Sequence, residues 1–321
     1  MLMVDLLVAR EMKTSPSPLI KKGNGRGVKP LPILMKTIDT LVEDIYNLFS
    51  PAEFSMDEKE IDTYVNEFAE NIKEHLKAAL HEGQRGKNNL RLSAIGRPDR
   101  QLWYDINMEK ESTPVSASTR IKFLYGYILE ELLIALSRLA GHTVTDTQKE
   151  VSVEGVKGHQ DCVIDGVLVD CKSTSPRGFE KFEKGDLVKD DPFGYIAQIS
   201  AYAEGNGVDE AAFLAINKQS GEICLAPVHS LEMIDAKKRV KHLIKVVRNG
   251  TLIPDRCYSD VKDGVSGNKR LGTSCIYCNH KRECWKDSND GHGLRVFDYA
   301  RGYRYLTKVV KIPDVPEITK W

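Results

Sequence analysis

Apolar residues recur at helical spacing in the first quarter of the chain. Between residues 36 and 82 they form two series on either side of Ser50-Pro51, namely Ile38, Leu41, Ile45, Leu48 and then Ile61, Val65, Phe68, Ile72, Leu76. Apolar positions three or four residues apart share one helix face, so the pattern predicts two amphipathic helices, which we interpret as accessory. Residues 13–32 are rich in Pro, Gly, Ser and Lys without periodicity, which predicts a flexible lead-in.

The clearest helical pattern covers residues 118–140. The segment STRIKFLYGYILEELLIALSRLA begins at a capping serine, Ser118, and is apolar over much of its circumference. It predicts a largely buried helix with Glu130 and Glu131 in its middle.

The pattern changes to strands after Gly141. Strand-like segments run through 148–172, and a helix is predicted from Asp191-Pro192, because proline is favoured directly after an N-cap. The remaining expectations are strands near 211–217 and 222–227, a basic amphipathic helix at 230–248, and a final hairpin in LRVFDYARGYRYLTKVVKIP.

The segment GHQDCVIDGVLVDCKSTS, residues 158–175, places charged residues within a pair of apolar strands. Asp165-Gly166 predicts a two-residue type I′ turn, which requires positive φ at both positions. This turn pairs residue 164 with 167, and therefore Asp161 with Asp170 and His159 with Lys172.

Strand alternation then sorts the hairpin into two faces. The apolar face holds both hairpin cysteines, which we interpret as core, and the other face holds Asp161, Asp170 and Lys172. Directly opposed residues have Cβ atoms about 5 Å apart, so two aspartates at such positions repel each other unless a cation lies between them. Hard oxygen ligands suit Mg²⁺ or Mn²⁺. A lysine beside a metal-bound water is suited to phosphodiester hydrolysis. The alternative is a hairpin with two solvated carboxylates and a pairing lysine.

Four ordered motifs carry a family resemblance. They are G-x-x-x-E from Gly126 to Glu130, G-x-x-D from Gly158 to Asp161, D-x-K from Asp170 to Lys172, and Q-x-x-x-Y from Gln198 to Tyr202. Together they resemble the PD-(D/E)xK nuclease superfamily, in its RecB-type and phage exonuclease branch, over about residues 85–285. The resemblance implies an α/β fold of the restriction-endonuclease type, with a mixed central sheet flanked by helices.

The resemblance also implies a role for each motif residue. Glu130, Asp161, Asp170 and the backbone carbonyl of Cys171 would bind the metal, and Lys172 would serve the attacking water. Gln198 and Tyr202 would position DNA or the lysine, although two residues four apart on a helix can also form a simple packed pair. His159 is a lesser candidate. Asp170 stands where this branch more often has Glu.

The chain has seven cysteines, and four of them, Cys257, Cys275, Cys278 and Cys284, form C-x17-C-x2-C-x5-C. An odd number of cysteines with this clustering indicates metal ligands in a reducing compartment rather than disulfides. Four thiolates at this spacing can hold Zn²⁺ or an iron–sulfur cluster. The C-x2-C-x5-C part of this pattern resembles that of iron–sulfur nucleases of the same branch. Those nucleases take their remaining cysteine ligand from far upstream, at a position where this chain has Arg97-Pro98. We expect a structural [4Fe–4S] cluster with Cys257 as the fourth ligand. The alternative is Zn²⁺, with His280 as a possible ligand.

Basic residues gather in 85–107, where Arg91, Arg97 and Arg100 lie near Tyr104. This pattern predicts a nucleic-acid-binding edge, with a solvated face as the alternative. Lys plus Arg and Asp plus Glu both total 46, so a nucleic-acid surface must be local. The sequence has no apolar run of about 18 residues and no signal-peptide pattern, so we expect a cytoplasmic protein, in the host cytoplasm if phage-encoded, without membrane association.

We therefore predict an accessory helical region before the nuclease core and a cysteine-containing segment after it, with boundaries at 1–34 (lead-in), 35–84, 85–250 and 251–321. The predicted function is a Mg²⁺- or Mn²⁺-dependent DNA exonuclease of phage or mobile-element type, acting in DNA processing, recombination or repair. The expected partners are DNA and a recombinase, helicase or single-strand-binding protein, and the oligomeric state stays open. The alternatives are a structure-specific endonuclease and a non-catalytic nucleic-acid-binding protein.

Overall fold

The computed structural model describes residues 36–50, 56–81, 89–108, 117–248, 250–300 and 302–319. The predicted lead-in lies outside these residues, as does the beginning of the basic stretch at 85–88. Within the described residues, no helix combines the length and the apolar character needed to cross a membrane.

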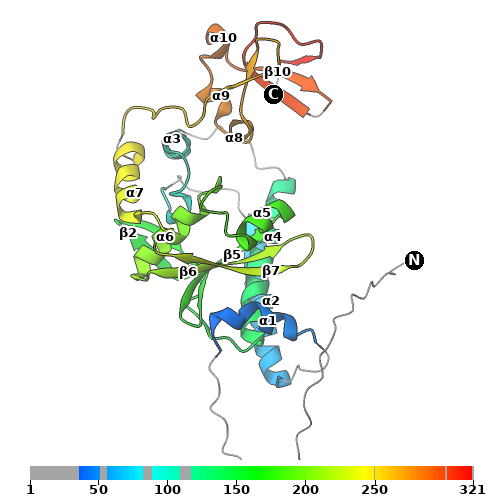
Figure 1. Cartoon of the computed structure of the whole chain (residues 1–321), viewed down its shortest axis with the longest axis vertical. Helices are drawn as coiled ribbons and strands as arrows, with labels where there is room; N and C mark the ends of the chain where they lie inside the picture. The colour runs from blue at the N-terminus through cyan, green and yellow to red at the C-terminus, as the bar shows by residue number, and fades with distance from the viewer. Residues whose placement is uncertain are drawn as a thin grey trace, which may run out of the picture. The chain divides into compact units, whose positions relative to one another are not determined.

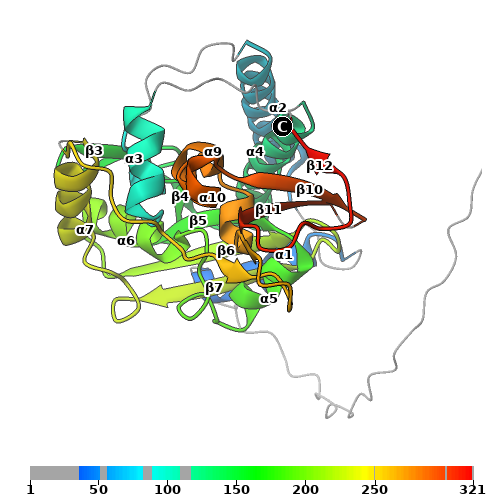
Figure 2. The ribbon, with the colours of Figure 1, turned by 90° about the horizontal axis from the view of Figure 1, so that it is seen from above.

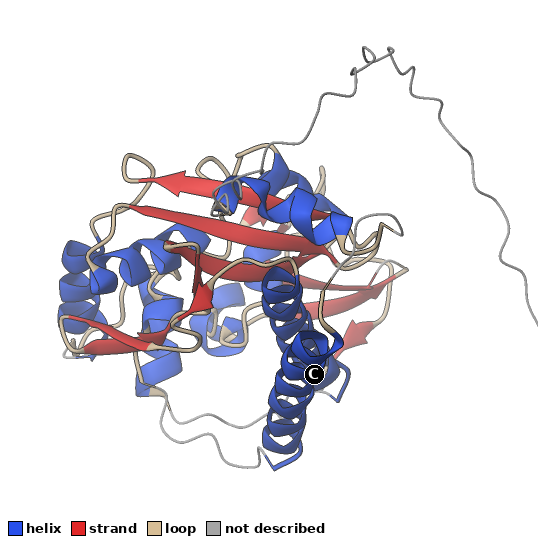
Figure 3. Ribbon diagram, turned by 90° about the horizontal axis from the view of Figure 1, so that it is seen from below, coloured by secondary structure: helices blue, strands red, loops and turns tan. Residues whose placement is uncertain are grey.

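A mixed five-stranded sheet forms the centre of the fold, as predicted (Figure 3). Its strands lie in the order β1-β4-β5-β6-β7. β5 and β6 are parallel, and the other neighbours are antiparallel. The strand bounds are Val144–Thr145 (β1), Cys162–Ile164 (β4), Val167–Thr174 (β5), Glu210–Asn217 (β6) and Ile223–His229 (β7).

Helices pack on both faces of this sheet. One apolar cluster joins a sheet face to helices α5, α6 and α7, and a second cluster joins the opposite face to α1 and α4. In β5, Leu168 belongs to the first cluster, whereas Val169 and Cys171 belong to the second, which confirms the predicted alternation. The helix bounds are Leu41–Asn47 (α1), Ala117–Leu139 (α4), Pro176–Glu183 (α5), Tyr195–Asn206 (α6) and Ala236–Leu243 (α7).

The hairpin between β4 and β5 has the predicted turn and register. Asp165 and Gly166 have φ angles of 49° and 87°, and Ile164 pairs with Val167. The regular pairing ends at Cys162 and Val169. Beyond that point His159 pairs with Glu150, in a separate two-stranded sheet of β2 (Glu150–Val153) and β3 (Val156–His159). The predicted pairing of His159 with Lys172 is therefore wrong, because the chain turns into a different hairpin.

The long helices α2 (Glu58–His81) and α4 lie side by side (Figure 1). The fully buried residues of α4 all lie at or beyond Glu131. Its N-terminal half exposes large apolar side chains, namely Ile121, Phe123, Tyr125, Tyr127 and Ile128. The prediction of a largely buried helix is wrong for this half, because the apolar cluster against the sheet begins only at Leu129.

Two helices begin later than predicted, and in both an aspartate carboxylate binds backbone N–H groups at the point where the helix starts. The Asp191 carboxylate accepts hydrogen bonds from the backbone N–H of Gly194 and Ile196, both at 2.8 Å, so α6 starts at Tyr195. Asp235 accepts from the N–H of Lys238, so the basic helix starts at 236 and continues as a π-helix, Ile244–Arg248. Helix α3 (Asp99–Asn107) and α5 were not predicted.

The C-terminal segment forms a second, antiparallel five-stranded sheet, in the order β12-β10-β11-β9-β8. The predicted final hairpin is confirmed as β10 and β11, which Figure 2 shows beside the short helices α9 and α10. The bounds are Val261–Lys262 (β8), Lys269–Arg270 (β9), Thr273–Ile276 (α8), Lys281–Cys284 (α9), Ser288–Gly291 (α10), Arg295–Tyr299 (β10), Gly302–Lys308 (β11) and Glu317–Ile318 (β12).

Candidate active site and cysteine pocket

Strand β5 and helix α6 bring the D-x-K and Q-x-x-x-Y residues together. Asp170 is only 1% exposed, and the side-chain amide of Gln198 donates a hydrogen bond to its Oδ1 at 3.0 Å. The ammonium of Lys172 forms an ion pair with Oδ2 of the same carboxylate. Lys172 and Asp170 share a strand face because they are two residues apart. The site is thus centred on a buried, charged carboxylate.

Asp161 lies just before β4, outside the regular pairing. Its Oδ2 accepts a hydrogen bond from the backbone N–H of Cys171 at 2.7 Å, which holds the carboxylate beside Asp170. Burial, and then the negative charge of Asp170, raise the pKa of Asp161 to about 7. The two aspartates therefore repel each other, as the predicted register implied.

Glu130 reaches the same site from α4. The side-chain amide of Gln148 donates to its Oε1 at 2.6 Å. Burial, followed by the charges of Asp161 and Asp170, raises the pKa of Glu130 to about 9. Its neighbour Glu131 faces elsewhere, as expected, and accepts a hydrogen bond from Asn71 on α2 at 2.8 Å.

The ammonium of Lys172 is held in its protonated form. Burial favours the neutral amine, but the charges of Asp170 and Asp161 outweigh this effect and raise the pKa of Lys172. The Tyr195 ring lies against the ammonium, with its centroid 5.2 Å from Nζ. In this arrangement the Lys172 ammonium is a positive charge held beside the Asp170 carboxylate.

Tyr202 is almost completely buried, 2% exposed, and packs against Gly158 of β3. Its hydroxyl oxygen lies 3.5 Å from the side-chain amide nitrogen of Gln198. Burial raises the pKa of this hydroxyl. Tyr202 therefore supports Gln198, which in turn orients Asp170. His159, the lesser candidate, is exposed on β3.

The donor set of this site fits a hard divalent cation. Three carboxylates and the carbonyl of Cys171 offer only oxygen ligands, which Mg²⁺ and Mn²⁺ prefer. Oδ2 of Asp170 is buried and receives no hydrogen bond among the described residues, although Lys172 balances its charge. No three Asp, Glu, His or Cys side chains of the described chain already lie close enough to hold an ion. The carboxylates would therefore have to converge on a bound ion.

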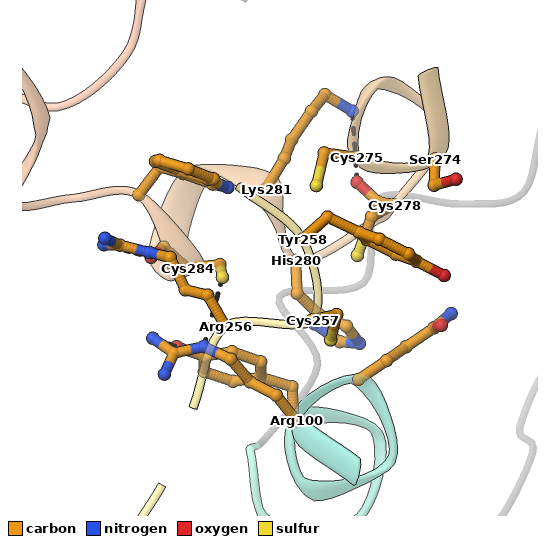
Figure 4. A pocket seen from close by; sticks show the side chains of 13 residues that line it. Arg100, Arg256, Cys257, Tyr258, Ser274, Cys275, Cys278, His280, Lys281 and Cys284 are labelled. Atoms are coloured by element: carbon orange, nitrogen blue, oxygen red, sulfur yellow. Dashed lines mark hydrogen bonds between the residues drawn. The ribbon is translucent and has the colours of Figure 1, made fainter. Parts of the chain in front are cut away.

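The four C-terminal cysteines line one small cavity of about 40 Å³, together with Arg100 and Tyr104. Figure 4 shows the thiols of Cys257, Cys275, Cys278 and Cys284 around it. Burial, and then the neighbouring thiols, raise the pKa of Cys275 to about 11. The four cysteines that the spacing singled out thus line one cavity, but among the described residues no three of them lie close enough together to hold an ion.

Arg100 and Tyr104, which we predicted at an exposed nucleic-acid-binding edge, face the cysteine pocket instead. Arg100 donates hydrogen bonds to Sγ of Cys284 at 3.2 Å and to the carbonyl of Pro254 at 2.6 Å. Tyr104 is 2% exposed and stacks on His280, whose Nε2 lies 2.8 Å from Asp105. These side chains face the cysteine pocket because α3 packs there. Of the predicted edge, Arg91 and Arg97 are exposed.

Two residues of the site have no counterpart in the sequence motifs that we used. Gln148 holds Glu130, and Tyr195 contacts Lys172. Tyr195 lies three residues before Gln198 on α6, so helical spacing provides a signal for it. Gln148 lies in the turn before β2, and no signal in the sequence identifies it.

No family model matches the chain, and no curated protein matches it. Several solved structures are distantly similar. The protein SSO0001 is 18% identical, with 67% of this chain and 94% of that chain covered and a TM-score of 0.38. The alkaline exonuclease of Laribacter hongkongensis is 14% identical (49% and 90% covered, TM-score 0.32). A phage-related exonuclease of Haemophilus somnus 129PT is 17% identical (50% and 93% covered, TM-score 0.33). These likenesses are too weak to define a family, so the function is argued from the site.

Proposed function

We propose that the chain is a metal-dependent deoxyribonuclease. The observation that carries this proposal is the convergence of Asp161, Asp170 and Lys172, from one hairpin, with Gln198 on α6. A cluster of one buried and two half-buried carboxylates beside a fixed ammonium suits the hydrolysis of a phosphodiester, whose charge increases during the reaction. A purely structural hairpin has no need to bury these charges.

Each side chain has a distinct role in this proposal. Glu130, Asp161, Asp170 and the Cys171 carbonyl would hold Mg²⁺ or Mn²⁺, which lowers the pKa of a bound water and offsets charge on the phosphate. Gln198 fixes the orientation of Asp170 through its 3.0 Å hydrogen bond. Lys172 donates hydrogen bonds toward the attacking water or the phosphate, and Tyr202 supports Gln198.

We further propose that the enzyme acts on DNA ends, as a phage or mobile-element exonuclease in DNA processing, recombination or repair. The test compares end-labelled linear DNA with closed circular DNA in Mg²⁺, Mn²⁺ or EDTA. Metal-dependent loss of linear DNA alone is the expected result. Cleavage of the circle would instead support a structure-specific endonuclease. Binding without any cleavage would support a non-catalytic protein.

We propose that the cysteine pocket binds a [4Fe–4S] cluster that fastens the C-terminal segment to α3. Four thiols line the pocket, and the N–H donor of Arg100 at Cys284 stabilises sulfur that carries negative charge. Zn²⁺ is the alternative, but Nε2 of His280 already lies beside Asp105. Iron and sulfide analysis of protein purified without oxygen tests the proposal. Zinc without iron would contradict it.

A further inference from the structure

A row of contacts leads from the proposed active site to the surface. The ammonium of Lys172 lies 5.2 Å from the centroid of the Tyr195 ring. Tyr195 in turn stacks on Phe193, with centroids 5.4 Å apart and ring planes 26° from parallel. Phe193 is 67% exposed. An exposed aromatic ring therefore lies only two contacts from the lysine.

The segment that carries Phe193 is fixed on several sides. The Asp191 carboxylate accepts hydrogen bonds from the backbone N–H of Gly194 and Ile196. The backbone of Gly194 lies so close to Gly96 that a Cβ on Gly194 would be 2.5 Å from Cα of Gly96. Behind the segment, the Tyr195 ring contacts the rings of two core phenylalanines, Phe182 and Phe213. Phe193 is thus presented to solvent by a well-packed segment.

An arginine lies on the segment that touches the backbone beside Phe193. Arg97 follows Gly96 directly, so it and Phe193 flank the contact between the two glycines. The Arg97 side chain is 51% exposed, and its ion-pair partner Asp105 is 3.7 Å away. An exposed aromatic ring with an arginine on the adjoining segment can bind an unpaired nucleotide, because the base stacks on the ring and the phosphate pairs with the arginine.

A single exposed phenylalanine is ordinary on a protein surface. Phe193 differs because it ends a row of rings that reaches the active-site lysine. A base inside a duplex already has neighbours on both of its faces, so a base that stacks on this ring must be unpaired or lie at a duplex end.

We propose that Phe193 is a stacking platform for an unpaired base next to the phosphate that is cleaved. This inference rests on the proposed nuclease function and specifies its substrate as single-stranded DNA or a frayed end. Arg97 would contact the backbone of the same strand.

Fluorescence of 2-aminopurine at the single-stranded end of an oligonucleotide tests the platform, with Ca²⁺ in place of Mg²⁺ to limit cleavage. The emission of this base falls when it stacks on a ring. We expect the wild type to quench the emission and Phe193→Ala not to quench it, with affinity lower by about 5- to 150-fold. Phe193→Tyr keeps an aromatic ring and should retain the quenching.

Phe49→Ala is the matched control, because Phe49 is also an exposed phenylalanine (71%) and lies outside this row. It should behave as the wild type does. Equal quenching by the wild type and Phe193→Ala, or none by the wild type, would overturn the inference. Quenching that depends on Phe193, in a protein that cleaves no DNA with Mg²⁺ or Mn²⁺, would keep the stacking site and refute the nuclease function.

Discussion

The ring of Tyr202 lies against the backbone of Gly158, so that a Cβ atom on Gly158 would come within 2.9 Å of Tyr202 Cε1. The same Cβ would be 2.8 Å from Cβ of Leu92. The two motifs G-x-x-D and Q-x-x-x-Y therefore meet in space, and the glycine is the residue that lets β3 approach α6. This contact sets the spacing between the strand that leads to Asp161 and the helix that carries Gln198.

Gly158→Ala should therefore destabilise the protein and reduce cleavage. The added methyl group must displace Tyr202 or Leu92, and overpacking of this kind costs about 1–3 kcal/mol. Thermal unfolding measures the loss. Gly126→Ala is the control, since its Cβ would meet nothing within 4 Å in α4, and alanine favours helix there by up to about 1 kcal/mol. A Gly158→Ala protein that unfolds at the wild-type temperature would contradict the packing argument.

Gln198→Ala should weaken metal binding more than it weakens the fold. The substitution removes the hydrogen bond that orients Asp170, and losing such a supporting contact typically costs 10- to 100-fold in metal affinity. Titration with Mn²⁺ gives the affinity directly. Gln219→Ala changes an exposed glutamine that is distant in the chain from the motif, and should leave the affinity unchanged. Unaltered Mn²⁺ affinity in Gln198→Ala would show that the hydrogen bond has no role in binding.

Arg100→Ala should loosen the C-terminal segment. The guanidinium donates to Cys284 and to the Pro254 carbonyl, and hydrogen bonds from charged groups contribute about 1.5–3 kcal/mol each. We expect a lower unfolding temperature and less iron retained per chain. Arg97→Ala provides the comparison, because the Arg97 side chain is half exposed and its 3.7 Å ion pair with Asp105 should contribute little to stability. Equal stability of both variants would be evidence against this role of Arg100.

The ion pairs of Asp99, the first residue of α3, should make stability depend on acid pH. Burial raises its pKa, but hydrogen bonds from His242 and Arg239 outweigh burial and hold the pKa below the ordinary value of an aspartate. Because the folded pKa is depressed, the contribution is complete above the unfolded pKa and is lost as pH falls through the folded value. Asp99→Asn should cost about 1–2 kcal/mol near neutral pH and progressively less below about pH 4. Unfolding measured in urea across this range checks the prediction, and a difference that does not change with pH would refute it.

The sequence was sufficient to predict the hairpin because local rules decide it. Asp165-Gly166 fixes the turn, and strict alternation then places Asp170 and Lys172 on one face and Cys171 on the other. These features depend on neighbours in the chain, so they required no knowledge of the rest of the fold. These local rules did not predict the residue at which the hairpin ends, because β3 pairs with β2 and not with β5.

The exposed half of α4 and the position of Arg100 were not predictable in this way. Apolar content predicts burial only if a partner covers that part of the helix, and the cluster on the sheet reaches only from Leu129 onward. The side chain of Arg100 faces Cys284, a residue 184 positions later. Spacing within α3 carries no information about which distant segment will cover it.

The central claim is that this site cleaves DNA, and Lys172→Ala tests it most directly. Single-turnover cleavage of end-labelled linear DNA with Mg²⁺ should fall by about 10²- to 10³-fold, the range typical of a lost charge-stabilising group. Lys189→Ala is the control, since Lys189 is 80% exposed and forms a surface ion pair with nearby Asp186. Full activity in Lys189→Ala with its loss in Lys172→Ala is the predicted result, and cleavage that survives Lys172→Ala would contradict the account.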